Sequence, residues 1–150
     1  MTRVALDTNL LLLFVVGRAT GRVLGSRLKS YSLEDYKLLA SQIEPYERIV
    51  TTPHVLTELT NIYDRGIDGD LRRLVGEVIG DVIATATECF RPSRSIAVDP
   101  EFKRLGLADC AWLLLLESDT DLLTDDLVLY NVARSRGHAA INFTNLRDFN

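Results

Sequence analysis

The chain opens with Arg3-Val4-Ala5-Leu6-Asp7, a largely apolar run that ends in a carboxylate, and Thr8-Asn9 follow it directly. The run has the length and composition of a short buried strand. Because Asp, Thr and Asn all favour helix N-termini, we expect the apolar residues Leu10 to Val16 to form a helix, which Gly17 would end. This strand and helix form the first unit of a predicted α/β fold.

The rest of the chain repeats this alternation of short apolar runs with longer amphipathic segments. Further strands are expected at Ile49 to Thr52, Leu122 to Thr124 and Ala139 to Phe143. Helices are expected from the cap Ser32 to about Ile43, from Pro53 to Tyr63, from Asp70 to Glu88, from Leu107 to Glu117 and from Leu127 to Arg136. The pattern predicts one domain over residues 1–150, with a mostly parallel sheet and helices on both faces.

Composition narrows the class of protein. Hydrophobic residues make up 47% and charged residues 25% of 150, which excludes collagen, coiled-coil and intrinsically disordered chains. The net charge of −4 argues against a surface that binds polyanions in general. It does not exclude an enzyme whose carboxylates are neutralised by bound cations, because four such acids would account for the whole excess.

The cellular setting follows from cysteine use and hydropathy. Cys89 and Cys110 are too few for a disulfide framework. No secretory signal precedes the first strand, and the apolar segment from Val4 to Val16 is too short to span a bilayer and contains Asp7. We therefore expect a cytoplasmic protein with reduced thiols and no membrane contact.

Acidic side chains recur where predicted strands end and helices begin. Asp7 ends the first strand and Asp125-Asp126 follow Leu122 to Thr124, while Glu58 and Asp109 lie in helices that start near the same edge. Ligands of open parallel sheets bind at the carboxyl ends of the strands. Clustered carboxylates repel one another, and a hard divalent cation such as Mg²⁺ or Mn²⁺ reverses that cost.

Each acid also has a simpler interpretation. Asp7 could cap the following helix, and Asp109 could favour the dipole of a helix first turn. Glu58 could be an exposed helix residue, and Asp125-Asp126 could form a turn and a cap. Their joint placement at one sheet edge favours a shared site.

Four motifs contain these acids, in the order Val4-Ala5-Leu6-Asp7-Thr8-Asn9, Thr52-Pro53-His54-Val55-Leu56-Thr57-Glu58-Leu59, Leu107-Ala108-Asp109 and Leu123-Thr124-Asp125-Asp126-Leu127. Taken together, the four motifs resemble the PIN-domain nucleases. The order and approximate spacing of the acids agree along essentially the whole chain. The resemblance implies a three-layer α/β/α fold and Mg²⁺- or Mn²⁺-dependent cleavage of single-stranded RNA.

The same resemblance implies roles for individual residues. Asp7, Glu58, Asp109 and Asp126 would be the catalytic acids and metal ligands. Thr8, Asn9, Thr124 and Asp125 would support them, and Asp125 could also be a ligand, a substitute or a turn residue. The ions would activate water and stabilise the transition state, with Glu58 or Asp126 as general base.

The sequence also leads to expectations about RNA-binding residues and protein partners. The segment from 17 to 31 is a glycine-punctuated loop whose Arg18, Arg22, Arg27 and Lys29 are the best candidates to bind RNA phosphates. Relatives of toxin type imply a homodimer inhibited by a small antitoxin protein. The stripe from Leu71 to Ala86, flanked by Gly76 and Gly80, could serve the dimer, although a core face is the simpler interpretation.

Two other classes compete with the nuclease. One is a non-catalytic module of the same fold that binds RNA or a protein. The other is an acid-rich phosphatase, whose second acid would be expected two residues after the nucleophile, where this chain has Asn9. A phospho-acceptor receiver domain would need a late lysine, and residues 127–150 contain none.

Overall fold

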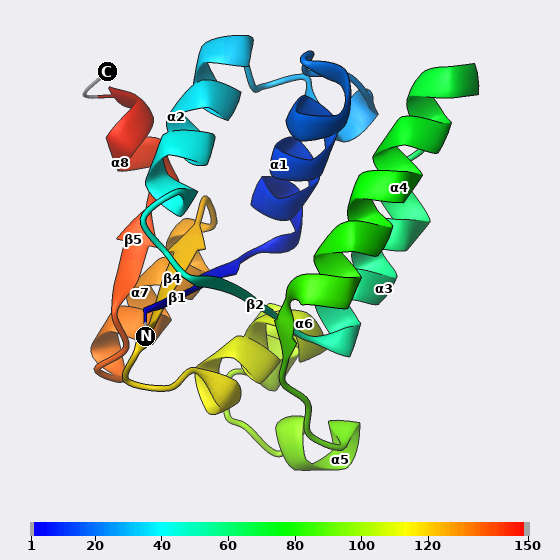
Figure 1. The fold of residues 1–150 in the computed structure, drawn as a ribbon. Helices are drawn as coiled ribbons and strands as arrows, with labels where there is room; N and C mark the ends of the chain where they lie inside the picture. Colours follow the sequence, from blue (N-terminus) through cyan, green and yellow to red (C-terminus); the bar gives the residue numbers. More distant parts are fainter. Residues whose placement is uncertain (1, 149–150) are drawn as a thin grey trace.

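The computed structural model describes residues 2–148 and has an all-parallel sheet at its centre (Figure 1). In this part of the chain five strands pair in the order β3-β2-β1-β4-β5. β1 and β4 are in register from Arg3 opposite Thr120 to Leu6 opposite Leu123. The strand bounds are β1 Arg3–Leu6, β2 Arg48–Thr51, β3 Thr87–Glu88, β4 Thr120–Thr124 and β5 Ala140–Asn142.

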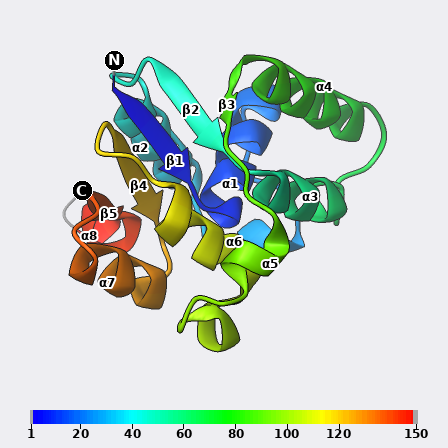
Figure 2. The same ribbon diagram turned by 90° about the horizontal axis from the view of Figure 1, so that it is seen from below.

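Helices cover both faces of the sheet, which confirms the predicted three-layer α/β/α architecture (Figure 2). α1 and α2 lie on one face with α4 packed against α1, and α6 and α7 lie on the other. The helix bounds are α1 Thr8–Thr20, α2 Leu33–Ile43, α3 Pro53–Ile62, α4 Gly69–Thr85, α5 Ser93–Ile96, α6 Phe102–Leu115, α7 Leu127–Ser135 and α8 Phe143–Asp148.

The strand order creates a switch point between β1 and β4. The chain moves from β1 through β2 to β3 on one side, then crosses back to β4 and β5 on the other. Connections on the two sides of such a point leave toward opposite faces, so a crevice opens at the carboxyl ends of the two central strands. The residues that follow β1 and β4 therefore border this crevice.

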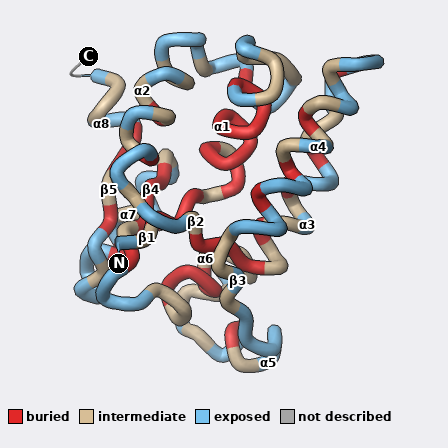
Figure 3. Tube along the Cα trace, in the orientation of Figure 1, coloured by how far each residue is buried: buried red, intermediate tan, exposed pale blue. Residues whose placement is uncertain are grey.

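α1 is the central helix of the core (Figure 3). Every residue from 10 to 17 is buried, because α2, α3 and α4 all contact this helix. On the opposite face, α6 buries four consecutive residues, Cys110, Ala111, Trp112 and Leu113, while the rest of the helix is partly or fully exposed.

The expected end of α1 at Gly17 is wrong. The helix continues to Thr20 and ends at Gly21, whose φ of 68° is left-handed and whose N–H donates to the Gly17 carbonyl at 2.8 Å. Gly17 instead allows α2 to approach closely, since a Cβ there would lie 2.2 Å from Cδ2 of Tyr36. The predicted loop is accordingly shorter at its start, and it contains a 3₁₀ turn over Ser26–Leu28.

The bounds of α4 and α6 also differ from the prediction. α4 ends at Thr85 and the chain becomes the short strand β3, where a helix to Glu88 was expected. α6 begins at Phe102 but is broken at Gly106, whose φ is 83°, so its second segment starts at Leu107 as predicted. It ends at Leu115 because Leu116 is extended.

The C-terminal region contains an element that was not expected. The last strand is Ala140–Asn142, and Phe143 begins α8 rather than ending the strand. Asn142 is buried at this junction and its Oδ1 accepts the Thr144 N–H at 2.9 Å, so a polar side chain turns the chain from strand to helix. In addition, the short helix α5 over Ser93–Ile96 lies in a stretch for which no helix was expected.

The apolar face of α4 is a core face. Val75, Ile79 and Val82 are buried in the main cluster, with Leu71, Val78 and Ala86 packed beside them. A Cβ on Gly80 would meet nothing within 4 Å, so this glycine is not needed for close packing within the chain. Within residues 2–148, no helix combines the length and hydropathy needed to cross a bilayer.

Candidate functional site

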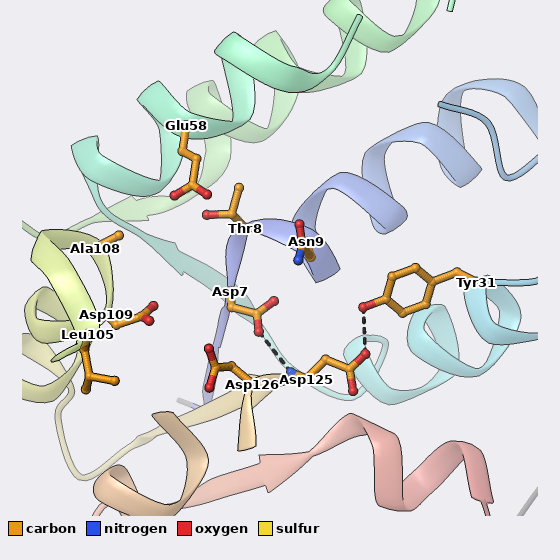
Figure 4. Close-up of a pocket in the computed structure, with 10 residues that line it drawn as sticks. All are labelled: Asp7, Thr8, Asn9, Tyr31, Glu58, Leu105, Ala108, Asp109, Asp125 and Asp126. Atoms are coloured by element: carbon orange, nitrogen blue, oxygen red, sulfur yellow. Dashed lines mark hydrogen bonds between the residues drawn. The ribbon is translucent and has the colours of Figure 1, made fainter. Parts of the chain in front are cut away.

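A polar cavity of about 390 Å³ lies at the switch point between β1 and β4 (Figure 4). Five acids from four separate parts of the chain line this cavity. Asp7 follows β1, Asp125 and Asp126 follow β4, Glu58 comes from α3 and Asp109 from α6. The complete lining is Asp7, Thr8, Asn9, Tyr31, Glu58, Leu105, Ala108, Asp109, Asp125 and Asp126.

Asp7 lies at the centre of a hydrogen-bond network. Its Oδ1 accepts the Leu10 N–H at 3.0 Å, so it caps α1 as the simpler interpretation proposed. Its Oδ2 accepts the Asp125 N–H at 2.9 Å and a short hydrogen bond from the Thr124 hydroxyl. Burial raises the pKa of the Asp7 carboxyl, although these hydrogen bonds act in the opposite direction. The cap and the site use the same side chain.

Asp126 has a similar position at the start of α7. Its Oδ1 accepts the Leu129 N–H at 3.0 Å, and its own N–H donates to Thr124 Oγ1 at 3.0 Å. Thr124 therefore connects Asp7 and Asp126 through one buried hydroxyl. The two acids are fixed at helix N-termini, where the partial positive charge of each helix favours a carboxylate.

The pKa of Asp109 is raised by burial and by the other acids of the cavity. Burial, followed by the negative charges of Asp126, Asp7 and Glu58, raises the pKa of its carboxyl from 3.8 to about 7. The kink at Gly106 precedes it, so Asp109 lies in the first turn of the second segment of α6. The convergence expected from the sequence is present: all four acids border one cavity.

Asp125 is held by residues that the sequence analysis did not assign to the site. The Tyr31 hydroxyl donates to its Oδ2 at 2.6 Å, Thr144 of α8 donates to Oδ1, and Arg147 Nη1 lies 3.7 Å from Oδ2. Burial and the Asp125 carboxylate both raise the pKa of the Tyr31 phenol. Asp125 thus joins the loop before α2 to α8. The participation of α8 could not be foreseen, because that helix was not predicted.

The basic loop contributes one side chain beside the acids. Arg27 Nη2 donates to Asn9 Oδ1 at 3.2 Å and lies 4.0 Å from Glu58 Oε1. Arg22 and Lys29 are exposed and do not line the cavity. Arg18 lines a different cavity with Tyr46 and neighbours at the start of β2, near the opposite edge of the sheet. The structure therefore brings one of the four expected basic residues to the acids.

The donor chemistry suits a hard divalent cation, but the side chains do not form a closed ligand group. Carboxylate oxygens are the ligands that Mg²⁺ and Mn²⁺ prefer, and the pKa of Asp109 is raised first by burial and then by the neighbouring carboxylates. Within residues 2–148, no three His, Cys, Asp or Glu side chains stand together so that they could hold a metal ion.

The arrangement is thus an open acidic cavity whose rigid members are Asp7 and Asp126. The Glu58 side chain is 44% exposed, which leaves it free to change rotamer. Such a cavity can attract cations, and it repels polyanions unless cations or Arg27 compensate its charge. No protein-family model, curated protein or solved structure matches this chain.

Proposed function

We propose that this chain is a Mg²⁺- or Mn²⁺-dependent endoribonuclease that cleaves single-stranded RNA. The observation that carries the proposal is the convergence of Asp7, Glu58, Asp109 and Asp126 on one cavity at the switch point of a parallel sheet. The resemblance of the four sequence motifs to PIN-domain nucleases adds the substrate class.

The four acids would hold the cation or cations. When bound, the metal supplies Lewis acidity, which lowers the pKa of water and neutralises charge on the phosphate. Asp7 is held in place for this role by Thr124 and the Asp125 N–H. Glu58, which is partly exposed, and Asp126, which keeps Oδ2 free of the cap, are the groups available to accept a proton from water.

Arg27 is the residue in this proposal that meets the RNA phosphate. It already lies beside Glu58 and Asn9, and its side chain is 43% exposed, so it can turn toward a ligand at low cost. A guanidinium can bind two phosphate oxygens at once. Arg22 and Lys29, which are also exposed, would contact phosphates further along the strand.

A non-catalytic binding module is the second candidate. The observation in its favour is that Asp7 and Asp126 already serve as helix caps, and that the described residues form no ready metal group. In that case the acids would stabilise the fold and Arg27 would bind the ligand. Such a module would bind RNA or a protein and cleave neither.

Cleavage of a fluorescent single-stranded RNA in Mn²⁺ distinguishes the two candidates. The nuclease proposal expects cleavage by the wild type, loss of at least about 100-fold in rate for Asp109→Asn, and inhibition by a chelator. Asp81→Asn, an exposed acid on α4, is the matched control and should cleave normally. Binding without cleavage in Mg²⁺ and in Mn²⁺ would support the module instead.

The cellular role belongs to the same proposal. A toxin would act in the cytoplasm as a homodimer and would be inhibited by a small antitoxin protein that covers the acidic cavity. Because the apolar face of α4 is used by the core, the dimer contact would lie on other surfaces. Light scattering on the purified protein would give the oligomeric state, and a monomer would remove the dimer from the proposal.

A further inference from the structure

A second hollow adjoins the acidic cavity on the side of α3. It also has a volume of about 390 Å³, and it is lined by Pro53, His54, Thr57 and Asn61 of α3 and Leu107 of α6. Glu58 and Ala108 line both spaces, so the two spaces are neighbours that meet at these residues. Figure 4 shows these two residues on the same side of the acidic cavity.

The side chains of the hollow differ in chemistry from those of the acidic cavity. Glu58, at the boundary, is its one carboxylate, and its lining contains no lysine or arginine. His54, Thr57 and Asn61 offer hydrogen-bond donors and acceptors, while Pro53, Leu107 and Ala108 provide apolar surface. A volume of this size, apolar with a few polar groups, is typical of a site for a small organic group.

Two features of the fold shape this hollow. Pro53, Thr57 and Asn61 are spaced four residues apart, so they form one face of α3. On the other wall, the left-handed Gly106 breaks α6 and starts a new helical segment at Leu107, directly opposite α3. Without this break the first turn of α6 would continue along the same axis.

We propose that the hollow binds the base and ribose of the nucleotide next to the cleaved phosphate. This inference rests on the proposed function. The lining has no cation to bind a phosphate, and its polar groups suit the edge of a base or a ribose hydroxyl. The shared lining residues Glu58 and Ala108 place the hollow directly beside the acidic cavity. The occupant is therefore the uncharged part of a single-stranded RNA.

The test measures binding in a protein that does not cleave. In an Asp109→Asn background, the dissociation constant of a short fluorescent single-stranded RNA is compared with that of the same RNA made abasic at one nucleotide beside the cleaved bond. Asn61→Ala and His54→Ala should each weaken binding of the intact RNA about 5- to 30-fold and leave binding of the abasic RNA unchanged.

Two further variants make the test sharper. Thr57→Trp is placed on an exposed turn of α3, where it fills the hollow without entering the core, and it should weaken binding of the intact RNA at least as much. Thr60→Ala, on the same helix but outside the hollow, is the control and should bind like the parent.

The outcomes separate this inference from the proposed function. Unchanged affinity in Asn61→Ala, His54→Ala and Thr57→Trp, with wild-type cleavage intact, would overturn the base-binding hollow alone. Equal weakening of intact and abasic RNA would also overturn it, because a backbone contact would then explain the loss. If the parent binds no single-stranded RNA and the wild type cleaves none, the proposed function fails and the inference with it.

Discussion

Thr124 and Thr51 are two buried threonines in the sheet with opposite surroundings. Thr124 Oγ1 donates to Asp7 and accepts the Asp126 N–H at 3.0 Å. Thr51 ends β2, and its Oγ1 is buried without a hydrogen-bond partner among the described residues. One hydroxyl therefore holds the Asp7 carboxylate and the Asp126 backbone N–H, while the other costs free energy without compensation.

We expect the same substitution at these two positions to have opposite effects. Thr124→Val removes one of the two hydrogen bonds to Asp7 Oδ2 and leaves the Asp126 N–H without its partner, so it should lower the free energy of unfolding by about 1–3 kcal/mol. Thr51→Val removes an unsatisfied group and should be neutral or stabilising. Urea denaturation of both variants checks this. A Thr124→Val protein as stable as Thr51→Val would show that the Asp7 network contributes little.

Asp109 gives a prediction on pH. Its pKa is raised to about 7, so its contribution to stability is fully present below the ordinary pKa near 3.8 and is lost as the pH rises through 7. In the absence of metal, Asp109→Asn should therefore melt above the wild type by roughly 3–6 °C near pH 8. Near pH 5 the difference should be less than half as large, because the loss of stability accumulates between the two pKa values.

Thermal melting of both proteins at the two pH values, with a chelator present, measures this difference. Asp81→Asn, which changes the same charge on an exposed surface, controls for net charge. A gap that is equal at both pH values, or an Asp109→Asn protein that melts below the wild type near pH 8, would mean that Asp109 mainly stabilises its helix.

Much of the site could be predicted from single residues, and the rest depended on tertiary contacts. Acids that directly follow strands, such as Asp7 and Asp126, were placed correctly because parallel strands bring their carboxyl ends together. The anchoring of Asp125 was not predictable, because Tyr31 and Thr144 are distant in sequence. Arg27 could not be distinguished from Arg18 without knowing where α1 ends.

At the scale of elements, the end of α1 was predicted wrongly because Gly17 was interpreted as a helix end. Gly17 and Gly80 are both inside helices, but only Gly17 has a side chain against it, the Tyr36 ring, which lies 2.2 Å from where a Cβ would be. A glycine within an apolar run indicates either a helix end or close packing, and the sequence does not distinguish the two. The short strand β3 was not predicted, because a strand of two residues shows no alternating pattern in the sequence.

The two glycines offer a matched pair of alanine substitutions. Gly17→Ala places a methyl group into the Tyr36 ring and should destabilise the protein by about 1–3 kcal/mol. Gly80→Ala meets nothing within 4 Å and should stabilise it by about 0.5–1 kcal/mol through helix propensity. Chemical denaturation would measure both. If Gly17→Ala proved as stable as Gly80→Ala, the tight contact of α1 with α2 would be disproved.

For the whole molecule, the alternation of strands and helices was sufficient to predict the layers. A parallel sheet needs crossover helices, so the class of fold follows from the order of elements. The strand order β3-β2-β1-β4-β5 was not predictable from this alternation, because local patterns do not specify on which side of β1 the chain returns. That return places β4 beside β1, and with it Asp126 beside Asp7.

The most direct test of the cation-holding cavity is the melting temperature measured during a Mn²⁺ titration. A ligand that binds only the folded state stabilises it by about 2.7 kcal/mol at one hundred times its dissociation constant, or roughly 5–10 °C in a chain of this size. We expect a saturable rise of this order for the wild type and for Asp81→Asn, and less than a third of it for Asp109→Asn. Identical curves for all three proteins, or no rise in any of them, would contradict the claim that these acids bind a metal together.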